Sequence, residues 1–111
     1  MQLKDRVIAI TGGARGLGFA MAKRLGEKGA KVALMDMNAE ALDSAVTKLA
    51  SEGIEAQAFV TNVAEEASVS QAFSDIAQYM GAISGLVNNA GITKDALLVK
   101  AKDGEVSKRM P

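Results

Sequence analysis

Residues 11–18, TGGARGLG, place four glycines in eight positions, directly between two apolar stretches. Where a buried strand turns straight into a helix, the first backbone N–H groups of the helix lack partners and carry partial positive charge. Gly12, Gly16 and Gly18 lack a Cβ, so the turn can be tight, a ligand can approach the backbone, and the helix can pack closely on the strand. The segment predicts a pyrophosphate site. A sharp turn without a ligand is the alternative, because the spacing is GxxxGxG instead of GxGxxG and the lysine of a P-loop is absent.

Asp36 lies 18 positions beyond Gly18, at the end of the second predicted strand. A carboxylate there can accept hydrogen bonds from both hydroxyls of an adenosine ribose, and its charge repels a 2′-phosphate. This favours NAD(H) over NADP(H). Arg15 keeps NADP(H) open as an alternative, because a guanidinium in the glycine turn can reach a 2′-phosphate. A structural role is also open for Asp36, which could help Asn38 to cap the following helix.

The composition excludes several other kinds of chemistry. Thirteen basic and thirteen acidic side chains balance in 111 residues, and neither His nor Cys is present. We therefore expect no metal site, no thiol nucleophile and no disulfide. Few aromatic residues and no basic run longer than two residues disfavour nucleic acid and an anionic membrane as partners. No stretch approaches the roughly 20 apolar residues of a membrane span, and no leader segment is recognisable, so we expect a cytoplasmic protein with a small-molecule or protein partner.

Short apolar segments alternate with amphipathic ones. The apolar segments have the length of strands buried on both faces of a parallel sheet, and they are residues 6–10, 30–35, 56–60 and 84–87. Between them, apolar side chains recur at helical spacing, in the sets Leu17/Met21/Leu25, Leu42/Ala45/Val46/Leu49 and Val69/Phe73/Ile76/Met80. Gly29, Gly53 and Gly81 follow these sets, where a left-handed residue commonly ends a helix. Right-handed crossovers then predict an α/β, Rossmann-type doubly wound parallel sheet with strand order 3-2-1-4.

The glycine turn and the sequence Asn88-Asn89-Ala90-Gly91 together resemble the classical short-chain dehydrogenase/reductase family. The similarity covers about the first 91 residues, and ITKDALL at residues 92–98 resembles the 3-oxoacyl-acyl-carrier-protein reductase branch. The resemblance implies an NAD(P)-dependent oxidoreductase that transfers hydride to a 3-oxoacyl thioester or related ketone. It also implies a set of cofactor-binding residues, namely Gly12, Arg15, Gly16, Leu17, Gly18, Asp36, Asn62, Val63, Asn89, Ala90 and Gly91.

Within this set, the resemblance assigns a part of the cofactor to each segment. The pyrophosphate would lie at residues 12–18 and the adenosine ribose at Asp36, while Asn62 and Val63 would edge the adenine. Residues 88–91 would end the fourth strand, steady the sheet and pass beside the nicotinamide ribose. Two simpler interpretations stay open: Asn62 could N-cap the third helix, and residues 88–91 could form only a turn after a strand.

The family's proton relay, a serine with a tyrosine and a lysine four residues after it, cannot be placed in this sequence. Tyr79, the only tyrosine, is followed four positions later by Ile83, and we expect it to be a packing residue. Hydride transfer to a carbonyl builds negative charge on an oxygen that then needs a proton. No catalytic residue is therefore assigned, and these 111 residues alone are expected to bind cofactor without efficient turnover.

The expected organisation is a dinucleotide-binding unit, residues 1–91, and an extended charged loop, residues 92–111, that leads to a C-terminal half absent from this sequence. Residues 99–109 look longer than the corresponding loop of the family. A fourth strand without a fifth beside it would present a free edge, which predicts a homo-oligomer or association with the missing half. A non-catalytic nucleotide-binding or assembly module is the competing function.

Overall fold

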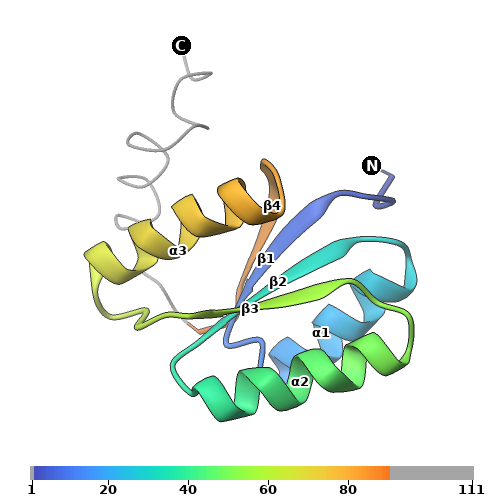
Figure 1. The fold of residues 1–111 in the computed structure, drawn as a ribbon, viewed down its shortest axis with the longest axis horizontal. Coiled ribbons are helices and arrows are strands. Elements are labelled where there is room, and N and C mark those ends of the chain that lie inside the picture. The colour runs from blue at the N-terminus through green and yellow to red at the C-terminus, as the bar shows by residue number, and fades with distance from the viewer. Residues whose placement is uncertain (1, 91–111) are drawn as a thin grey trace.

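The glycine turn is positioned by a sheet of four parallel strands within residues 2–90, the part of the chain that the computed structural model describes. The strand order β3-β2-β1-β4 confirms the predicted order 3-2-1-4, and each strand end agrees with its predicted position to within one residue. Helices and strands alternate (Figure 1) as β1 (Val7–Thr11), α1 (Gly16–Glu27), β2 (Lys31–Asp36), α2 (Ala39–Ser51), β3 (Ala56–Val60), α3 (Glu66–Tyr79) and β4 (Ile83–Asn88).

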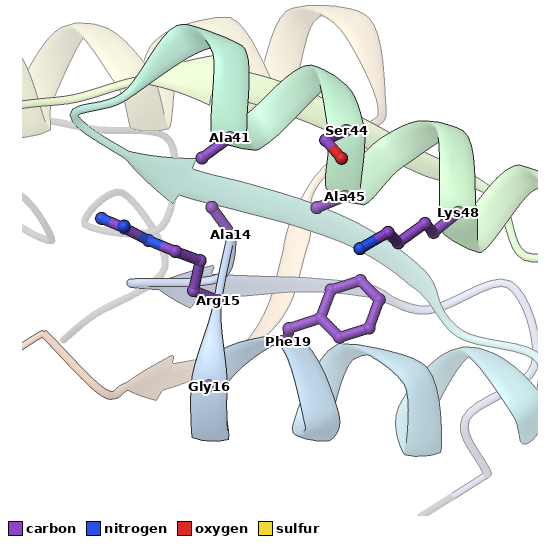
Figure 2. Close-up of a pocket in the computed structure, with 8 residues that line it drawn as sticks. All are labelled: Ala14, Arg15, Gly16, Phe19, Ala41, Ser44, Ala45 and Lys48. Carbon is purple, nitrogen blue, oxygen red and sulfur yellow. The ribbon is translucent and has the colours of Figure 1, made fainter.

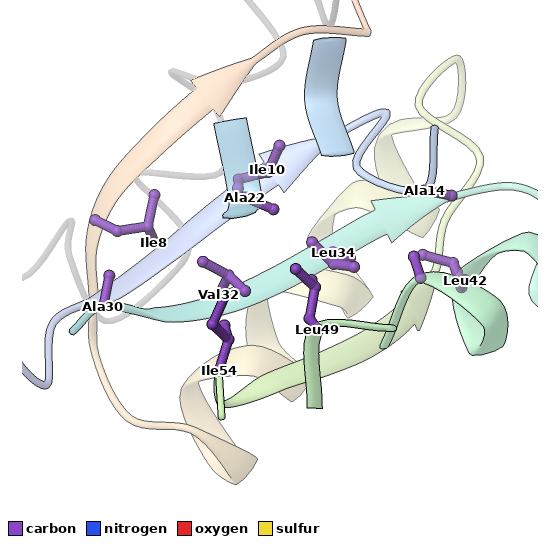
Figure 3. Packing of buried hydrophobic residues seen from close by; sticks show 11 residues of the cluster. Ile8, Ile10, Ala14, Ala22, Ala30, Val32, Leu34, Leu42, Leu49 and Ile54 are labelled. Atoms are coloured by element: carbon purple, nitrogen blue, oxygen red, sulfur yellow. The ribbon is translucent and has the colours of Figure 1, made fainter. Parts of the chain in front are cut away.

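Helices cover both faces of the sheet. α1 and α2 lie on one face and α3 on the other (Figure 1). Successive strand residues point to opposite faces, so Ile8 and Ile10 face α1 and α2 while Val7 and Ala9 face α3. Packing on both sides fixes β1 and therefore the turn that follows it. Figure 3 shows the larger cluster, on the side of α1 and α2, with Val32, Leu34, Leu42, Leu49 and Ile54 among its members.

The central strands are buried more completely than the edge strands. All five residues of β1 and four of the six residues of β2 are buried. β4 has no buried residue, and β3 ends in Val60, which is 62% exposed. The prediction of strands buried on both faces is therefore wrong for β3 and β4, because helices cover the edges of the sheet incompletely. In the described part of the chain, β4 has a strand on one side only.

The predicted sheet-facing stripe of α1 is wrong at Leu17 and confirmed at Leu25. Leu17 is 67% exposed, whereas Leu25 is partly buried against the core cluster. The buried residues of this helix are Gly18 and Ala22. The reason is how closely α1 lies on β1: a Cβ at Gly18 would overlap the carbonyl group of Gly12, so only small residues fit there. The stripes predicted for α2 and α3 are confirmed by burial of their members Leu42, Ala45, Leu49, Val69, Ile76 and Met80.

The residue types expected at the helix ends are found there, but Tyr79 does not have the packing role expected of it. Asn38 caps α2, because its Oδ1 accepts a hydrogen bond from the Ala41 N–H at 2.9 Å. Tyr79, expected to pack, is 64% exposed, since Ile76 and Met80 occupy the sheet-facing positions at this end of α3.

No helix in residues 2–90 has both the length and the apolarity that crossing a bilayer would require. The glycines after the three helices, Gly29, Gly53 and Gly81, have φ of +96°, +78° and +108°.

Candidate functional site

The glycine turn lies at the carboxyl edge of the sheet, between the end of β1 and the start of α1 (Figure 1). β1 has β2 on one side and β4 on the other, so the order of the strands reverses at this point. In open parallel sheets, a crevice for ligands forms outside the strand ends at such a reversal. The turn therefore occupies the position in the fold where small molecules are generally bound.

Gly12 makes the turn tight and anchors it to β2. Its φ is +65°, a left-handed conformation that strains most other residues. The N–H groups of Gly12 and Gly13 both donate to the Met35 carbonyl, at 2.7 and 3.3 Å. A Cβ at Gly12 would lie 3.0 Å from Nδ2 of Asn89. The first glycine of the motif is thus required by backbone conformation and by a close neighbour.

Gly16 and Gly18 differ in what surrounds them. Gly18 allows the close approach of α1 to β1, as its contact with Gly12 shows. Gly16 is the first residue of α1, has φ of +58°, and would have no atom of the described residues within 4 Å of an added Cβ. The backbone at Gly16 is therefore open to a ligand.

The N-terminus of α1 is uncapped by side chains of residues 2–90. Its N-cap residue, Arg15, makes no side-chain capping bond, and the first turn of the helix contains no acidic residue. The N–H groups of that turn and the positive end of the helix dipole face the carboxyl edge of the sheet. This arrangement suits the binding of a phosphate group.

Asp36, at the end of β2, bonds directly to the glycine turn. Its Oδ2 accepts a hydrogen bond from the Ala14 N–H at 3.2 Å, and its Oδ1 accepts one from the Met37 N–H at 2.8 Å. The interpretation that Asp36 helps Asn38 to cap α2 is wrong, because its carboxylate accepts from Ala14 and Met37, which lie outside the helix. A carboxylate has about four acceptor positions, so Asp36 retains capacity for the hydroxyls of a ribose.

Thr11 is a site residue that the glycine motif did not indicate. Its buried hydroxyl accepts a hydrogen bond from the Ala90 N–H at 2.9 Å and lies 3.2 Å from Oδ1 of Asn88, to which it can donate. The Asn89 Nδ2 donates to the Gly12 carbonyl at 3.4 Å. The segment after β4 therefore forms one wall of the glycine turn. A hydroxyl residue at the end of an apolar strand was the available signal for Thr11.

Asn62 and Val63 follow β3, at the same edge of the sheet. Asn62 accepts a hydrogen bond from the Ala64 N–H at 3.0 Å through its Oδ1, and its own N–H donates to the Ser68 Oγ at 2.8 Å. The interpretation of Asn62 as the N-cap of α3 is wrong, because Glu65 holds that position and Asn62 closes a turn before it. Val63 packs against apolar side chains of α3.

Large apolar side chains are exposed near the polar groups of this edge. Leu17, Met37 and Val60 are 67%, 65% and 62% exposed. Leu17 lies in the first turn of α1, Met37 follows β2, and Val60 ends β3. Apolar side chains beside convergent polar groups are typical of sites that bind small molecules. Neither Met37 nor Val60 belongs to a motif, and only their places at strand ends could have suggested them.

A cavity of about 380 Å³ opens beside the glycine turn, between α1 and α2 (Figure 2). Arg15 lies at the end of this cavity near the turn, and Lys48 lies at the opposite end (Figure 2). The full lining is Ala14, Arg15, Gly16, Phe19, Ala41, Ser44, Ala45 and Lys48.

Gly91, the last member of the predicted cofactor-binding set, lies outside the described residues, as do the predicted loop at 92–111 and its stretch 99–109. Within residues 2–90, no group of three His, Cys, Asp or Glu side chains could hold a metal ion.

Comparison with known proteins identifies one family. Residues 6–110 match the family described as short chain dehydrogenase. The chain is 38% identical over 105 residues to the 3-oxoacyl-[acyl-carrier-protein] reductase FabG of Pseudomonas aeruginosa, and the match covers 95% of this chain and 42% of that protein. The chain spans 36% and 42% of the length of two curated relatives that it matches.

Among solved structures of similar fold, one contains NAD⁺ and another contains NADP. An NAD⁺-bound xylitol dehydrogenase has a TM-score of 0.73 and 34% identity, over 78% of this chain and 33% of that one. A metagenomic short-chain oxidoreductase in complex with NADP has a TM-score of 0.76 and 29% identity, over 83% of this chain and 42% of that one. These likenesses do not distinguish NAD from NADP.

Proposed function

Because this chain belongs to the short-chain dehydrogenase family, we propose that it binds a nicotinamide dinucleotide for hydride transfer in an oxidoreductase. NAD(H) is the favoured cofactor, and a 3-oxoacyl thioester or related ketone is the substrate class. The matched relatives are more than twice as long as this sequence, so the activity and substrate are proposed from the likeness to them.

The open backbone at Gly16 is the observation that carries the proposal. Its φ is +58°, the space that a Cβ would fill is empty, and the helix behind it is uncapped. A pyrophosphate needs these three features to approach the backbone. Gly12 and Gly18 shape the turn by contacts within the protein. Gly16 has no such contact in the described chain, so space beside its backbone is left for a ligand.

The remaining parts of the dinucleotide follow from the positions of the other site residues. Arg15, Gly16, Leu17 and Gly18 would surround the pyrophosphate, and Asp36 would accept hydrogen bonds from the adenosine ribose. The exposed side chains of Met37 and Val60 would flank the adenine, with Asn62 and Val63 at its edge. Asn89, Ala90 and Gly91 would lie beside the nicotinamide ribose.

The preference for NAD(H) rests on the charge of Asp36. An ionised carboxylate repels a 2′-phosphate, and this one is held beside the glycine turn by its bond to the Ala14 N–H. Arg15 acts in the opposite direction, because its exposed guanidinium attracts a phosphate. We therefore propose a preference for NAD(H) in which NADP(H) binds more weakly.

The bound cofactor would supply the hydride, whereas this chain supplies binding and orientation. The hydride adds to the carbonyl carbon, and the carbonyl oxygen then needs a proton, generally from a phenol whose pKa a nearby lysine lowers. Tyr79 is exposed at the end of α3, and the residue four positions after it is Ile83. We therefore propose that these 111 residues bind cofactor without efficient turnover.

Replacing glycine by alanine at two matched positions tests the binding site. Gly16 and Gly53 both have positive φ, and an added Cβ at either would meet no described atom within 4 Å. Each substitution should cost a similar free energy of unfolding, about 1 to 2 kcal/mol. In an NADH titration followed by fluorescence, Gly16→Ala should weaken binding at least ~10-fold, and Gly53→Ala should leave it unchanged. Failure of the unmodified protein to bind NADH saturably would contradict the proposal.

A non-catalytic nucleotide-binding or assembly module is the second candidate, and the unpaired side of β4 in the described chain favours it. Turnover of an acetoacetyl thioester with NADH separates the two functions. Saturable NADH binding with no turnover agrees with a binding module and with the proposed lack of a proton relay. A measurable rate from the purified 111 residues would show that a relay is present after all.

A further inference from the structure

The cavity between α1 and α2 extends well beyond the glycine turn. Ala41 and Lys48 both line it and are seven residues apart on α2. At 1.5 Å per residue they are about 10 Å apart along the helix axis. Figure 2 shows Lys48 at the end of the cavity away from Arg15 and the turn. This end has no part in the dinucleotide site proposed above.

The lining of the cavity carries two positive charges and no carboxylate. In residues 2–90 the ion pairs join Lys23 to Glu52 and Lys31 to Glu55. Neither Arg15 nor Lys48 takes part in them. The two acidic residues of α2, Glu40 and Asp43, are not among the lining residues. The lining itself therefore presents positive charge without a carboxylate.

Apolar groups form the rest of the cavity. The Phe19 ring lies between the two helices in Figure 2, and Ala41 and Ala45 lie opposite it on α2. The Ser44 hydroxyl is on the same helix, one turn before Lys48. Sites for small molecules generally have a volume of about 300 to 1,000 Å³, an apolar lining and a few polar groups that fix the orientation of the ligand. This cavity has a volume of about 380 Å³ within that range, and its lining is both apolar and polar.

We propose that the end of the cavity at Lys48 is a second binding site, for a small aromatic monophosphate. The ring of the ligand packs between Phe19 and the two alanines of α2, and its phosphate bonds to the Lys48 ammonium and the Ser44 hydroxyl. Lysine binds phosphate as a compact charge, and a hydroxyl donates to a phosphate oxygen. The site does not depend on the proposed dinucleotide function, because its anchors lie on the second and third turns of α2.

Phenyl phosphate is the probe for this site. In a titration followed by amide NMR shifts, it should bind saturably and shift the signals of Phe19, Ser44 and Ala45. Phenol and inorganic phosphate each offer half of the interactions, so each should bind at least ~10-fold more weakly. Equal affinity for inorganic phosphate would overturn the proposal, because it would show a surface anion site without a ring pocket.

Matched lysine variants locate the phosphate. Lys48→Ala should weaken phenyl phosphate binding about 10-fold, since a charge-assisted bond is lost. Lys28→Ala removes an exposed lysine outside the cavity and should leave the affinity unchanged. Equal weakening by both variants would show non-specific attraction and overturn the site. NADH should neither displace phenyl phosphate nor bind differently to Lys48→Ala, and complete displacement would overturn a separate site while leaving the dinucleotide proposal intact.

Discussion

The Asp36 carboxylate accepts a hydrogen bond from the backbone N–H of Ala14, so the end of β2 is linked directly to the glycine turn after β1. The same side chain accepts a second bond from the Met37 N–H. Asp36 therefore has a structural role in the candidate site, independent of any ligand that the site binds. A substitution here changes two properties, the stability of the turn and the charge that a ribose meets.

Two variants separate these properties. Asp36→Asn keeps an acceptor oxygen but removes the charge, whereas Asp36→Ala removes both. Both should raise the affinity for NADPH relative to NADH, because the repulsion of the 2′-phosphate is lost. Asp36→Ala loses both hydrogen bonds and Asp36→Asn loses one of them, so the free energy of unfolding should fall by about 1 kcal/mol per lost bond and should fall further in Asp36→Ala. The measurements are paired NADH and NADPH titrations and urea unfolding. An unchanged cofactor ratio in both variants would show that Asp36 has only its structural role.

Thr11 should matter for stability through its hydroxyl. Thr11→Val preserves the shape of the side chain but leaves the Ala90 N–H without its acceptor, at a site where Thr11 is fully buried. The expected loss is about 1 to 3 kcal/mol. Thr11→Ser keeps the hydroxyl and should lose less. Thermal unfolding compares the two variants, and a larger loss in Thr11→Ser than in Thr11→Val would attribute the effect to the methyl group instead.

Gly18→Ala should be more destabilising than Gly16→Ala. A Cβ at position 18 would overlap the Gly12 carbonyl, a backbone group that cannot rotate away, whereas a Cβ at position 16 meets no described atom within 4 Å. Overpacking costs about 1 to 3 kcal/mol, and the upper end of that range is expected here. Urea unfolding of both variants tests the order, and a reversed order would mean that α1 moves away from β1 at little cost.

The two helix starts provide a matched test of capping. Asn38→Ala removes the bond to the Ala41 N–H and should cost about 1 kcal/mol. Glu65 is the N-cap residue of α3 but makes no side-chain capping bond. Glu65→Ala should therefore change the free energy of unfolding by less than about 0.5 kcal/mol. Similar costs at both positions would contradict the assigned caps.

The strand order could be predicted because each strand is a short apolar run followed by an amphipathic segment, and crossovers have one hand. The stripe of α1 could not be predicted, because the motif glycine Gly18 takes the place against the sheet where a hydropathy pattern expects Leu17. Helical spacing identifies an apolar face but does not measure how near the helix lies to its strand.

Part of the candidate site was also visible in the sequence. The glycines and Asp36 stood out because their spacing is local and their chemistry is specific. The bonds of Thr11 to residues near the end of β4 join positions 77 and 79 residues apart, and no local pattern indicates such a pairing. The cavity at Lys48 likewise depends on two helices coming together, which only the folded chain shows.

β4 is the least buried strand described, yet its end is tied to the glycine turn through Thr11 and Asn89. A molecule that occupies the turn therefore also restrains this strand. By thermodynamic reciprocity, a protein chain that pairs with β4 would tighten nucleotide binding by the same factor that nucleotide tightens the pairing. Under the proposed function, strand pairing at β4 and binding of the coenzyme would be one coupled equilibrium.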